Sequence, residues 1–320
     1  MKAPVLSIVV PCYNEQDVFF LCLEELTSRI DEMIDKGKIH PDSHIVFVDD
    51  GSKDETWNLI QKESSINNRV KGVKLSRNKG HQIALMAGLS LSTESDITVS
   101  IDADLQDDTS VIEKMVDLFI SGKDIVYGVR NDRNSDSFFK KFTAELFYKT
   151  MTKLGVNQVE NHADFRLLSK RALLSLLEYK EQNLYIRGLI PLIGYPSAQV
   201  YYSRSERAAG ESKYPLKKML ALALEGVTSF SVTPLRMVTA LGFTISILST
   251  LGILYTLIQY FLGHTVSGWA SVILAVLFIG GVQMLCLGVI GEYIGKIYIE
   301  SKSRPKFFIE TTVNGGKGDE

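Results

Sequence analysis

The sequence contains only three cysteines among its 320 residues. The spacing of Cys12, Cys22 and Cys286 matches no metal-binding or redox motif, so neither a zinc site nor a disulfide framework is expected to organise the chain. We therefore expect a reduced catalytic part that faces the cytosol.

Two glycine-rich signatures of nucleotide-binding proteins are also missing. No G-x-G-x-x-G follows the first predicted strand, which argues against a Rossmann dinucleotide enzyme. No G-x-x-x-x-G-K-[ST] motif occurs, which argues against a P-loop NTPase. If the chain binds a nucleotide, side chains and a metal ion must therefore hold it.

The net charge is small, −2, but it is unevenly distributed. Residues 1–60 contain twelve acids and five bases, a net charge of −7. Residues 130–153 and 201–236 each contain six bases and three acids, a net charge of +3. Nucleic acid is therefore not expected as a partner, while the basic segments could face phosphate groups or an anionic membrane surface.

The first 130 residues alternate between short apolar runs and segments with helical periodicity. Strands are predicted at 5–10, 44–48, 70–75, around 99–101 and at 125–127. Helices are predicted at 17–36, 54–60, 83–89 and 109–119. This alternation predicts an α/β fold with a mostly parallel, doubly wound sheet. Polar clusters follow the strands at the sheet edge where such folds bind ligands.

The most informative of these clusters is Asp102-Ala103-Asp104-Leu105-Gln106, which ends the fourth predicted strand. Mg²⁺ and Mn²⁺ prefer oxygen ligands and often share their remaining positions with substrate phosphates. The motif therefore favours a clamp for a metal ion and a diphosphate. A surface turn is the alternative, because Asp-x-Asp occurs by chance in many loops.

Several motifs, taken together and in order, resemble those of a known enzyme group. Four motifs resemble those in the nucleotide-sugar half of inverting GT-A glycosyltransferases. They are Pro11-x-Tyr13-Asn14-Glu15, Asp49-Asp50-Gly51-Ser52-x-Asp54, Asn78-x-Gly80 and Asp102-Ala103-Asp104-Leu105-Gln106. Three further features resemble the polyprenyl-phosphate sugar transferases, the group of bactoprenol glucosyltransferases and dolichol-phosphate mannose synthases. They are Arg130, Ala163-Asp164-Phe165-Arg166 and Arg207-x-x-Gly210-x-Ser212-Lys213. The resemblance runs from about residue 6 to 305, and its specificity lies in the combination.

The resemblance implies a role for each matching position. The nucleotide base and ribose would be held by Pro11, Tyr13, Glu15 and Asp50, with support from Asp49. The metal, Mg²⁺ or Mn²⁺, would be held by Asp102, Asp104 and Gln106, with Asp102 and Ala103 beside the nucleotide. The phosphates of donor and lipid would be neutralised by Arg130, Arg207 and Lys213. Taken singly, Arg130 or Lys213 is equally well read as a solvated surface charge.

The resemblance also offers Asp164 as a catalytic base, in addition to the catalytic contribution of Asp104 through the metal. A phosphate monoester has its second pKa near ~6, so a lipid phosphate is mostly a dianion at neutral pH and has little proton to lose. We therefore predict that Asp164 chiefly orients the acceptor or a neighbouring cation such as Arg166. The alternative is a carboxylate that fixes the turn before Phe165.

Residues 237–291 contain no Asp, Glu, Lys or Arg, which predicts transmembrane helices at 237–262 and 269–291. Each exceeds the ~20 residues that cross a hydrocarbon layer of ~30 Å. Basic residues flank the pair, so the catalytic domain and both termini are expected in the cytosol; they are Arg236, Lys296, Lys302, Arg304 and Lys306. A buried hydrophobic hairpin in a soluble domain is the alternative.

Amphipathic basic segments at 138–149 and 212–230 are candidates for helices that lie on the membrane surface. For the first of them, a helix that faces the protein core is the alternative. The second membrane span carries small residues and Gln283, which needs a polar partner in hydrocarbon; the small residues are Gly281, Gly288, Gly291 and Gly295. We interpret them as packing positions in a homo-oligomer, for example a tetramer, with a substrate path as the alternative.

These observations predict a GT-A domain followed by interfacial helices and a two-helix transmembrane hairpin. The expected bounds are 1–211 for the GT-A domain, 212–236 for the juxtamembrane helix, 237–262 and 269–291 for the two spans, and 292–320 for a cytosolic tail.

The predicted reaction is inverting transfer of one sugar to polyprenyl (undecaprenyl) phosphate at the cytosolic face of the cell membrane, with UDP-glucose as the first choice of donor. Mannose, an N-acetylhexosamine or modified arabinose are alternative sugars. A processive polysaccharide synthase is disfavoured because no Q-x-x-R-W occurs and two spans are too few for a polymer channel. A non-catalytic membrane adaptor is disfavoured because a scaffold has no physical need for the Asp-x-Asp clamp.

Overall fold

The computed structural model describes residues 2–131, 162–182, 185–203, 233–262 and 268–314. The chain divides into two compact units. The first contains the sheet described below and includes the stretch that begins at Arg304, and the second contains the two long helices. The amphipathic segments predicted at 138–149 and 212–230 lie outside the described residues.

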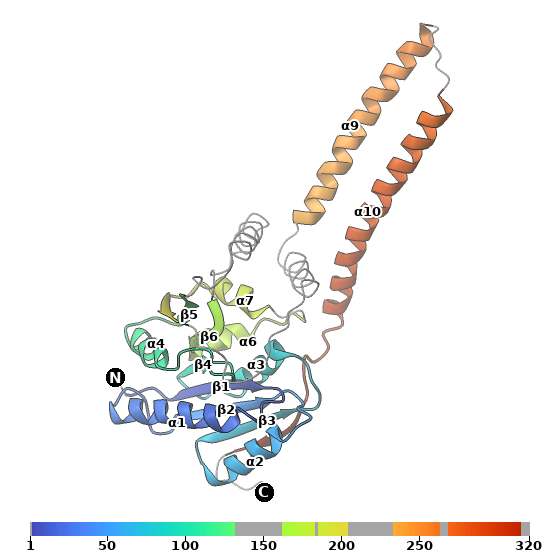
Figure 1. Ribbon diagram of the computed structural model, residues 1–320. Coiled ribbons are helices and arrows are strands. Elements are labelled where there is room, and N and C mark those ends of the chain that lie inside the picture. Colours follow the sequence, from blue (N-terminus) through green and yellow to red (C-terminus); the bar gives the residue numbers. More distant parts are fainter. Residues whose placement is uncertain (1, 132–161, 183–184, 204–232, 263–267, 315–320) are drawn as a thin grey trace. The chain divides into compact units, whose positions relative to one another are not determined.

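The first unit is built on one eight-stranded sheet (Figure 1). Its strands are β1 (Leu6–Cys12), β2 (His44–Asp49), β3 (Val70–Leu75), β4 (Ile97–Ser100), β5 (Ile125–Arg130), β6 (His162–Ser169), β7 (Ser197–Tyr202) and β8 (Ile309–Val313). They are arranged in the order β7-β5-β6-β4-β1-β2-β3-β8. The pairs formed by β6 and β8 are antiparallel and the other pairs are parallel, so the predicted mostly parallel α/β sheet is confirmed.

Alternation of side chains along the strands fills the two faces of the sheet. Ile8 and Val10 of β1 belong to the main core cluster, with residues of α1 (Phe19–Asp35), α2 (Thr56–Ile66) and α4 (Val111–Ile120). Val9 points to the other face, where α3 (His81–Ser90) contacts β1 and β2 and also α6 (Lys170–Leu177). A Cβ on Gly88 of α3 would overlap Val9, so glycine permits this close approach of helix and strand.

The direction of β6 decides where its first residues lie. Because β6 runs antiparallel to β4, Ser100 near the end of β4 pairs with Arg166 near the start of β6. The start of β6, with Asp164, therefore lies at the same sheet edge as the ends of the parallel strands. The short helix α7 (Ile186–Ile193) follows in the chain and contacts α6.

The sheet gains its last strand from beyond the second long helix. β8 pairs with β3, the Phe308 carbonyl accepts a hydrogen bond from the Ser76 amide at 3.0 Å, and Lys74 Nζ lies 2.9 Å from Glu310 Oε1. The sequence reading treated 292–320 only as a tail and did not predict this strand. A five-residue strand with a single acid, Glu310, and two threonines gives little periodic signal of its own, since its partner β3 supplies the pairing.

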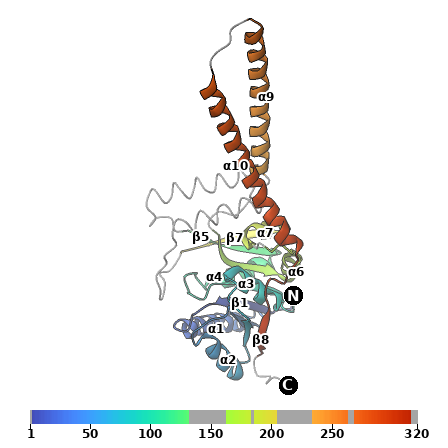
Figure 2. The same cartoon turned by 90° about the vertical axis from the view of Figure 1, so that its right-hand side faces the viewer.

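The second unit contains α9 (Thr233–Phe261) and α10 (Trp269–Ser301), which contact each other and run antiparallel (Figure 2). Each contains a stretch long and apolar enough to cross a membrane, Thr233–Gly252 and Phe278–Ser301. Helix α10 continues beyond the predicted span end at 291. Glu292 and Lys296 share i,i+4 spacing there, an arrangement that favours continued helix outside an apolar segment.

Candidate active site

The predicted site residues lie at the edge of the sheet where the parallel strands end, and loops from β1 and β2 are joined there. The Asn14 amide donates to Ser52 Oγ at 3.0 Å, and the Lys53 amide donates to Asn14 Oδ1 at 2.9 Å. Asn14 has a positive φ of 56°, a conformation that asparagine tolerates better than most residues. This exchange fixes the loop that carries Tyr13, which is 40% exposed, directly after the end of β1, where Pro11 is buried.

Asp49 and Asp50 at the end of β2 are buried and hold loop backbone. Asp49 accepts hydrogen bonds from the Ser52 amide at 3.2 and 3.3 Å, so it supports its own turn. Asp50 accepts from the backbone amides of Lys79 and Gly80 at 2.7 and 2.8 Å. Burial raises the pKa of both carboxyl groups, although these amides partly offset the rise.

Gly51 makes the approach of two loops possible. Its φ is +67°, and an added Cβ would lie 2.7 Å from the backbone nitrogen of Asn78. Any larger residue would therefore displace the loop after β3 in addition to being strained. The predicted clusters Asp49–Asp54 and Asn78–Gly80 are thus packed backbone against backbone.

The Asp-x-Asp motif begins two residues after β4 ends. Asp102 Oδ1 is buried and accepts no hydrogen bond within the described part of the chain, although His81 Nε2 lies 3.4 Å away. Burial raises the pKa of Asp102, and His81 partly opposes this. Leu105 has a positive φ of 52°, and this turn lets the Gln106 amide donate to Asp104 Oδ1 at 3.3 Å.

This arrangement fits a metal ion held partly by the protein. Asp102 Oδ1 is buried and accepts no hydrogen bond within the described residues, and a second carboxylate and an amide side chain follow it in the chain; together they offer hard oxygen ligands to a cation. Within the described ranges, no group of three or more His, Cys, Asp or Glu side chains is placed to hold a metal. Asp102, Asp104 and Gln106 would therefore supply only some of the ligands.

Asp164 lies at the centre of a cluster of cations. Of these cations, the sequence predicted only Arg166 as a neighbour of Asp164. Arg187 of α7 donates from Nε and Nη2 to the two Asp164 oxygens, both at 3.1 Å. Arg166 also donates to Asp164, and His81 Nε2 lies 3.4 Å from Asp164 Oδ2. Burial alone would raise the pKa of this carboxyl group, but His81, Arg166 and Arg187 outweigh it and hold the pKa well below the ordinary value.

Arg130, predicted to bind phosphate, is paired with protein groups. Its Nε and Nη2 donate to Asp107 Oδ1 at 3.0 and 2.8 Å, and the hydroxyl of Tyr202 donates to the same oxygen at 2.6 Å. Burial disfavours the Arg130 charge, but Asp107 outweighs this and raises its pKa. Arg207 and Lys213 lie outside the described residues, so their predicted phosphate contacts stay predictions.

The structure therefore brings Asp102, Asp104 and Asp164 to one edge with residues that sequence reasoning missed. Those are His81, Asp107, Arg187 and Tyr202. His81 immediately follows the Asn78-x-Gly80 motif, and Asp107 immediately follows Gln106, so their positions carried a weak signal. Nothing in the spacing of Arg187 or Tyr202 pointed to the site.

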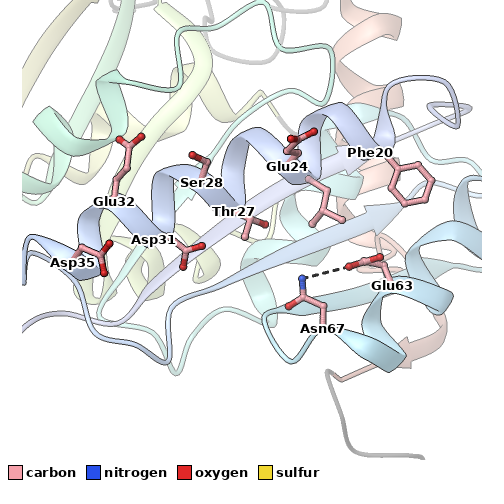
Figure 3. Close-up of a pocket in the computed structure, with 10 residues that line it drawn as sticks. Phe20, Glu24, Thr27, Ser28, Asp31, Glu32, Asp35, Glu63 and Asn67 are labelled. Atoms are coloured by element: carbon pink, nitrogen blue, oxygen red, sulfur yellow. Dashed lines mark hydrogen bonds between the residues drawn. The ribbon is translucent and has the colours of Figure 1, made fainter.

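A separate cavity of about 620 Å³ lies along α1 beside the end of α2 (Figure 3). Its lining is rich in acids, among them Glu24, Asp31 and Glu63, and Phe20 lies at one end. None of the predicted site residues lines it. An acidic surface of this kind repels nucleotide phosphates, so the cavity is not the candidate donor site.

A mostly parallel α/β sheet with carboxylates and cations at its C-terminal edge defines a GT-A-like domain, and two apolar helices follow it. The profile described as "Glycosyl transferase family 2" matches residues 7–177, and the profile "GtrB C-terminal hairpin" matches residues 233–297. The chain belongs to glycosyl transferase family 2 and carries a GtrB C-terminal hairpin.

Known proteins resemble this chain over nearly its whole length. The uncharacterized glycosyltransferase YkoT of Bacillus subtilis (strain 168) is 53% identical over 308 residues, which cover 96% of this chain and 91% of YkoT. A bactoprenol glucosyl transferase of Shigella phage SfX is 38% identical over 312 residues, 96% of this chain and 99% of that protein. Among solved structures, the chain is similar to mannosyltransferase PcManGT from Pyrobaculum calidifontis in complex with GDP-Man and Mn²⁺. The two are 16% identical with a TM-score of 0.46, and the match covers 91% of this chain and 87% of the PcManGT chain.

Proposed function

We propose that this protein transfers one glucose from UDP-glucose to undecaprenyl phosphate, which gives a polyprenyl monophosphate sugar. The observation that carries this proposal is the full-length similarity, at 38% identity, to a bactoprenol glucosyl transferase, hairpin included. The carboxylates and cations at the C-terminal edge of the sheet supply the chemistry that such a transfer needs. A lipid acceptor also agrees with two helices long and apolar enough to cross a membrane.

The donor would lie over the ends of β1 and β2. Pro11, Tyr13 and Glu15 would contact the base and ribose. The loops that Asp49 and Asp50 hold by hydrogen bonds would shape that pocket. Asp102 and Ala103 would lie beside the sugar diphosphate. Preformed loops keep the ordering cost of binding low, because their backbone is already held by hydrogen bonds.

Asp102, Asp104 and Gln106 would hold Mg²⁺ or Mn²⁺. A divalent ion there would stabilise the charge that develops on the departing diphosphate. The buried oxygen of Asp102 supports this assignment, because it accepts no hydrogen bond within the described residues, and a buried ionised oxygen is costly unless a cation joins it.

In the proposed reaction, an oxygen of the acceptor phosphate attacks the anomeric carbon of the sugar. The bond from that carbon to the diphosphate breaks, and the nucleoside diphosphate leaves with the bonding electrons. A single displacement of this kind inverts the anomeric centre. The acceptor enters as a dianion, so no proton has to be removed, and an Asp164 held ionised by His81 and two arginines is suited to orientation.

We propose that the catalytic domain and both termini face the cytosol, where nucleotide sugars are made. Arg236 near the start of α9 and Lys296, Lys302 and Arg304 near the end of α10 and beyond support this orientation by the positive-inside rule. Packing of the hairpins between subunits of a homo-oligomer remains our prediction for the small residues of α10.

The test is transfer of radiolabelled sugar from a panel of nucleotide sugars into lipid that can be extracted with organic solvent. UDP-glucose with undecaprenyl phosphate is expected to give labelled lipid with one sugar for each phosphate. Label from GDP-mannose, UDP-N-acetylhexosamine or a modified-arabinose donor alone would change the sugar and keep the reaction. A polymeric product would favour a processive synthase, and no label from any donor would favour an adaptor.

A further inference from the structure

Arg187 differs from the other arginines at this edge of the sheet. It comes from the first turn of α7 and spans both oxygens of Asp164 through Nε and Nη2, which leaves Nη1 outside that pair. Its side chain is 38% exposed. The Arg166 side chain is only 2% exposed, and Arg130, at 27%, is bonded to Asp107 and Tyr202. Arg187 is therefore the arginine of these three best placed to meet a ligand.

The order of strands assigns a side of the site to Arg187. The loops proposed to hold the nucleotide follow β1 and β2, and the Asp-x-Asp motif follows β4. On the other side of β4 lies β6, whose Asp164 holds Arg187. The strands that carry the donor loops, the metal ligands and Asp164 are thus arranged in sequence across the sheet edge, and this order favours the side beyond the metal ligands for the second substrate.

We propose that Arg187 binds the phosphate of the acceptor and that Asp164 is the residue that positions its guanidinium. This rests on the proposed function and adds a phosphate ligand to it. Arg187 pairs with Asp164 through Nε and Nη2 only and its side chain is 38% exposed, so its guanidinium can also contact an anion that arrives from solvent. Guanidinium groups match phosphate geometry, and a bidentate pair with a carboxylate fixes the fork in one orientation.

The experiment compares Arg187→Gln with Arg171→Gln in the full-length protein. Arg171 also spans a carboxylate, Asp124, and it belongs to α6, outside the proposed site, with a side chain that is 62% exposed. Arg187→Gln is expected to raise the KM for a short-chain polyprenyl phosphate by about 10- to 100-fold, as loss of a charge-assisted contact implies. The KM for the nucleotide sugar is expected to change less than about twofold, and Arg171→Gln to leave both values unchanged.

A second measurement separates binding from positioning. Equilibrium binding of the short-chain polyprenyl phosphate, with the corresponding polyprenol as a comparison, should weaken in Arg187→Gln for the phosphate only. Arg187→Lys should recover part of the affinity, since it keeps the charge and loses the fork. If Arg187→Gln lowers kcat with both KM values and the phosphate affinity unchanged, Arg187 only orients Asp164, and the proposal is wrong. A raised donor KM would move Arg187 to the donor side and would also overturn it.

The two proposals fail in different ways. If wild-type protein transfers no sugar but binds polyprenyl phosphate through Arg187, the proposed reaction is wrong and the phosphate site stands. If wild type transfers sugar and Arg187→Gln does so with unchanged constants, the reaction stands and the site is wrong. Thermal unfolding of Arg187→Gln and Arg187→Lys, each against wild type, shows which variant is folded, and the binding comparison is made on that variant.

Discussion

Asp50 and Asp164 are the same residue type, and both are buried at one edge of the sheet, with exposed fractions of 3% and 8%. Two backbone amides hold Asp50, and burial raises its pKa in spite of them. Three side chains that carry or can carry positive charge surround Asp164, and they lower its pKa well below the ordinary value. Similar burial therefore gives opposite shifts because the partners differ.

The comparison separates the site into two regions with different tasks. On the proposed donor side, carboxylates accept hydrogen bonds from loop backbone and hold it in place. On the proposed acceptor side, a carboxylate is the counter-ion of several cations, at the place where we propose that an anionic substrate binds. The first kind of region is sensitive to changes of shape, and the second is sensitive to changes of charge.

The largest effect is expected from Asp164→Asn. The variant removes the charge that compensates Arg166, which is 1% exposed, so the free energy of unfolding should fall by about 3–5 kcal/mol. Denaturant unfolding measures this, with Asp124→Asn as the control. Asp124 is also buried, but its partner Arg171 can be hydrated, so the control should lose less. Equal losses in the two variants would show that burial of the arginine partner does not make the Asp164 carboxylate more important for stability than Asp124.

Asp104→Asn should affect turnover more than stability. Asp104 is half-buried, so its replacement by asparagine should cost little stability, whereas removal of its charge weakens the proposed metal clamp and should lower kcat by about 10²–10³-fold. A transfer assay with and without a chelator measures this, together with the melting temperature. Full activity of the variant, or of wild type in the chelator, would remove the metal from the mechanism.

Gly51→Ala should break the donor side by shape alone. Its Cβ would overlap backbone of Arg77 and Asn78, so we expect a loss of about 2 kcal/mol in stability and weaker nucleotide binding. Gly37→Ala is the matched control, because Gly37 has a similar φ of +66° and open space around its Cβ position. Calorimetric titration with UDP and with a short polyprenyl phosphate should show only the UDP affinity reduced. An equal loss for both ligands would contradict the division into two regions.

The smallest effect is the pH dependence, where the two carboxylates should act in opposite directions. The stabilisation from Asp164 is complete above the unfolded-state pKa of about 3.9 and is lost as pH falls through its lower folded pKa. The contribution of Asp50 is complete below about 3.9 and is lost as pH rises through its raised folded pKa. Relative to wild type, Asp50→Asn and Asp164→Asn should therefore change the slope of unfolding free energy against pH with opposite signs. Slopes of one sign would refute the comparison.

The position of the proposed donor side at the sheet edge was much easier to predict from sequence than that of the proposed acceptor side. Strand β3 was predicted with its observed bounds, because its apolar run ends in turn residues. Each donor-side cluster directly follows a strand, so its place at the sheet edge followed from the parallel topology. The β-branched and apolar periodicity behind those strands depends only on neighbours in the chain.

The acceptor side depends on contacts between distant segments, and single-sequence patterns do not carry these. His81, Asp102, Asp164 and Arg187 come from four separate elements or loops, and the antiparallel entry of β6 brings them together. The Asp107 pair of Arg130 was hidden for the same reason. From sequence alone, an arginine within a motif is interpreted as a phosphate-binding group. Only the structure shows that a carboxylate of the protein is already paired with it.

Strand β8 has a consequence for how the protein is made. Its Glu310 bonds to Lys74, 236 positions earlier, and both hairpin helices lie between them in the chain. A ribosome therefore completes α9 and α10 before β3 can receive its outer neighbour. Until then the unpaired amides and carbonyls of β3 form an open edge that other chains can join. If biosynthesis stalls in the hairpin, the released chain lacks β8, and the outer edge of β3 stays unpaired. We expect such chains to aggregate through β3.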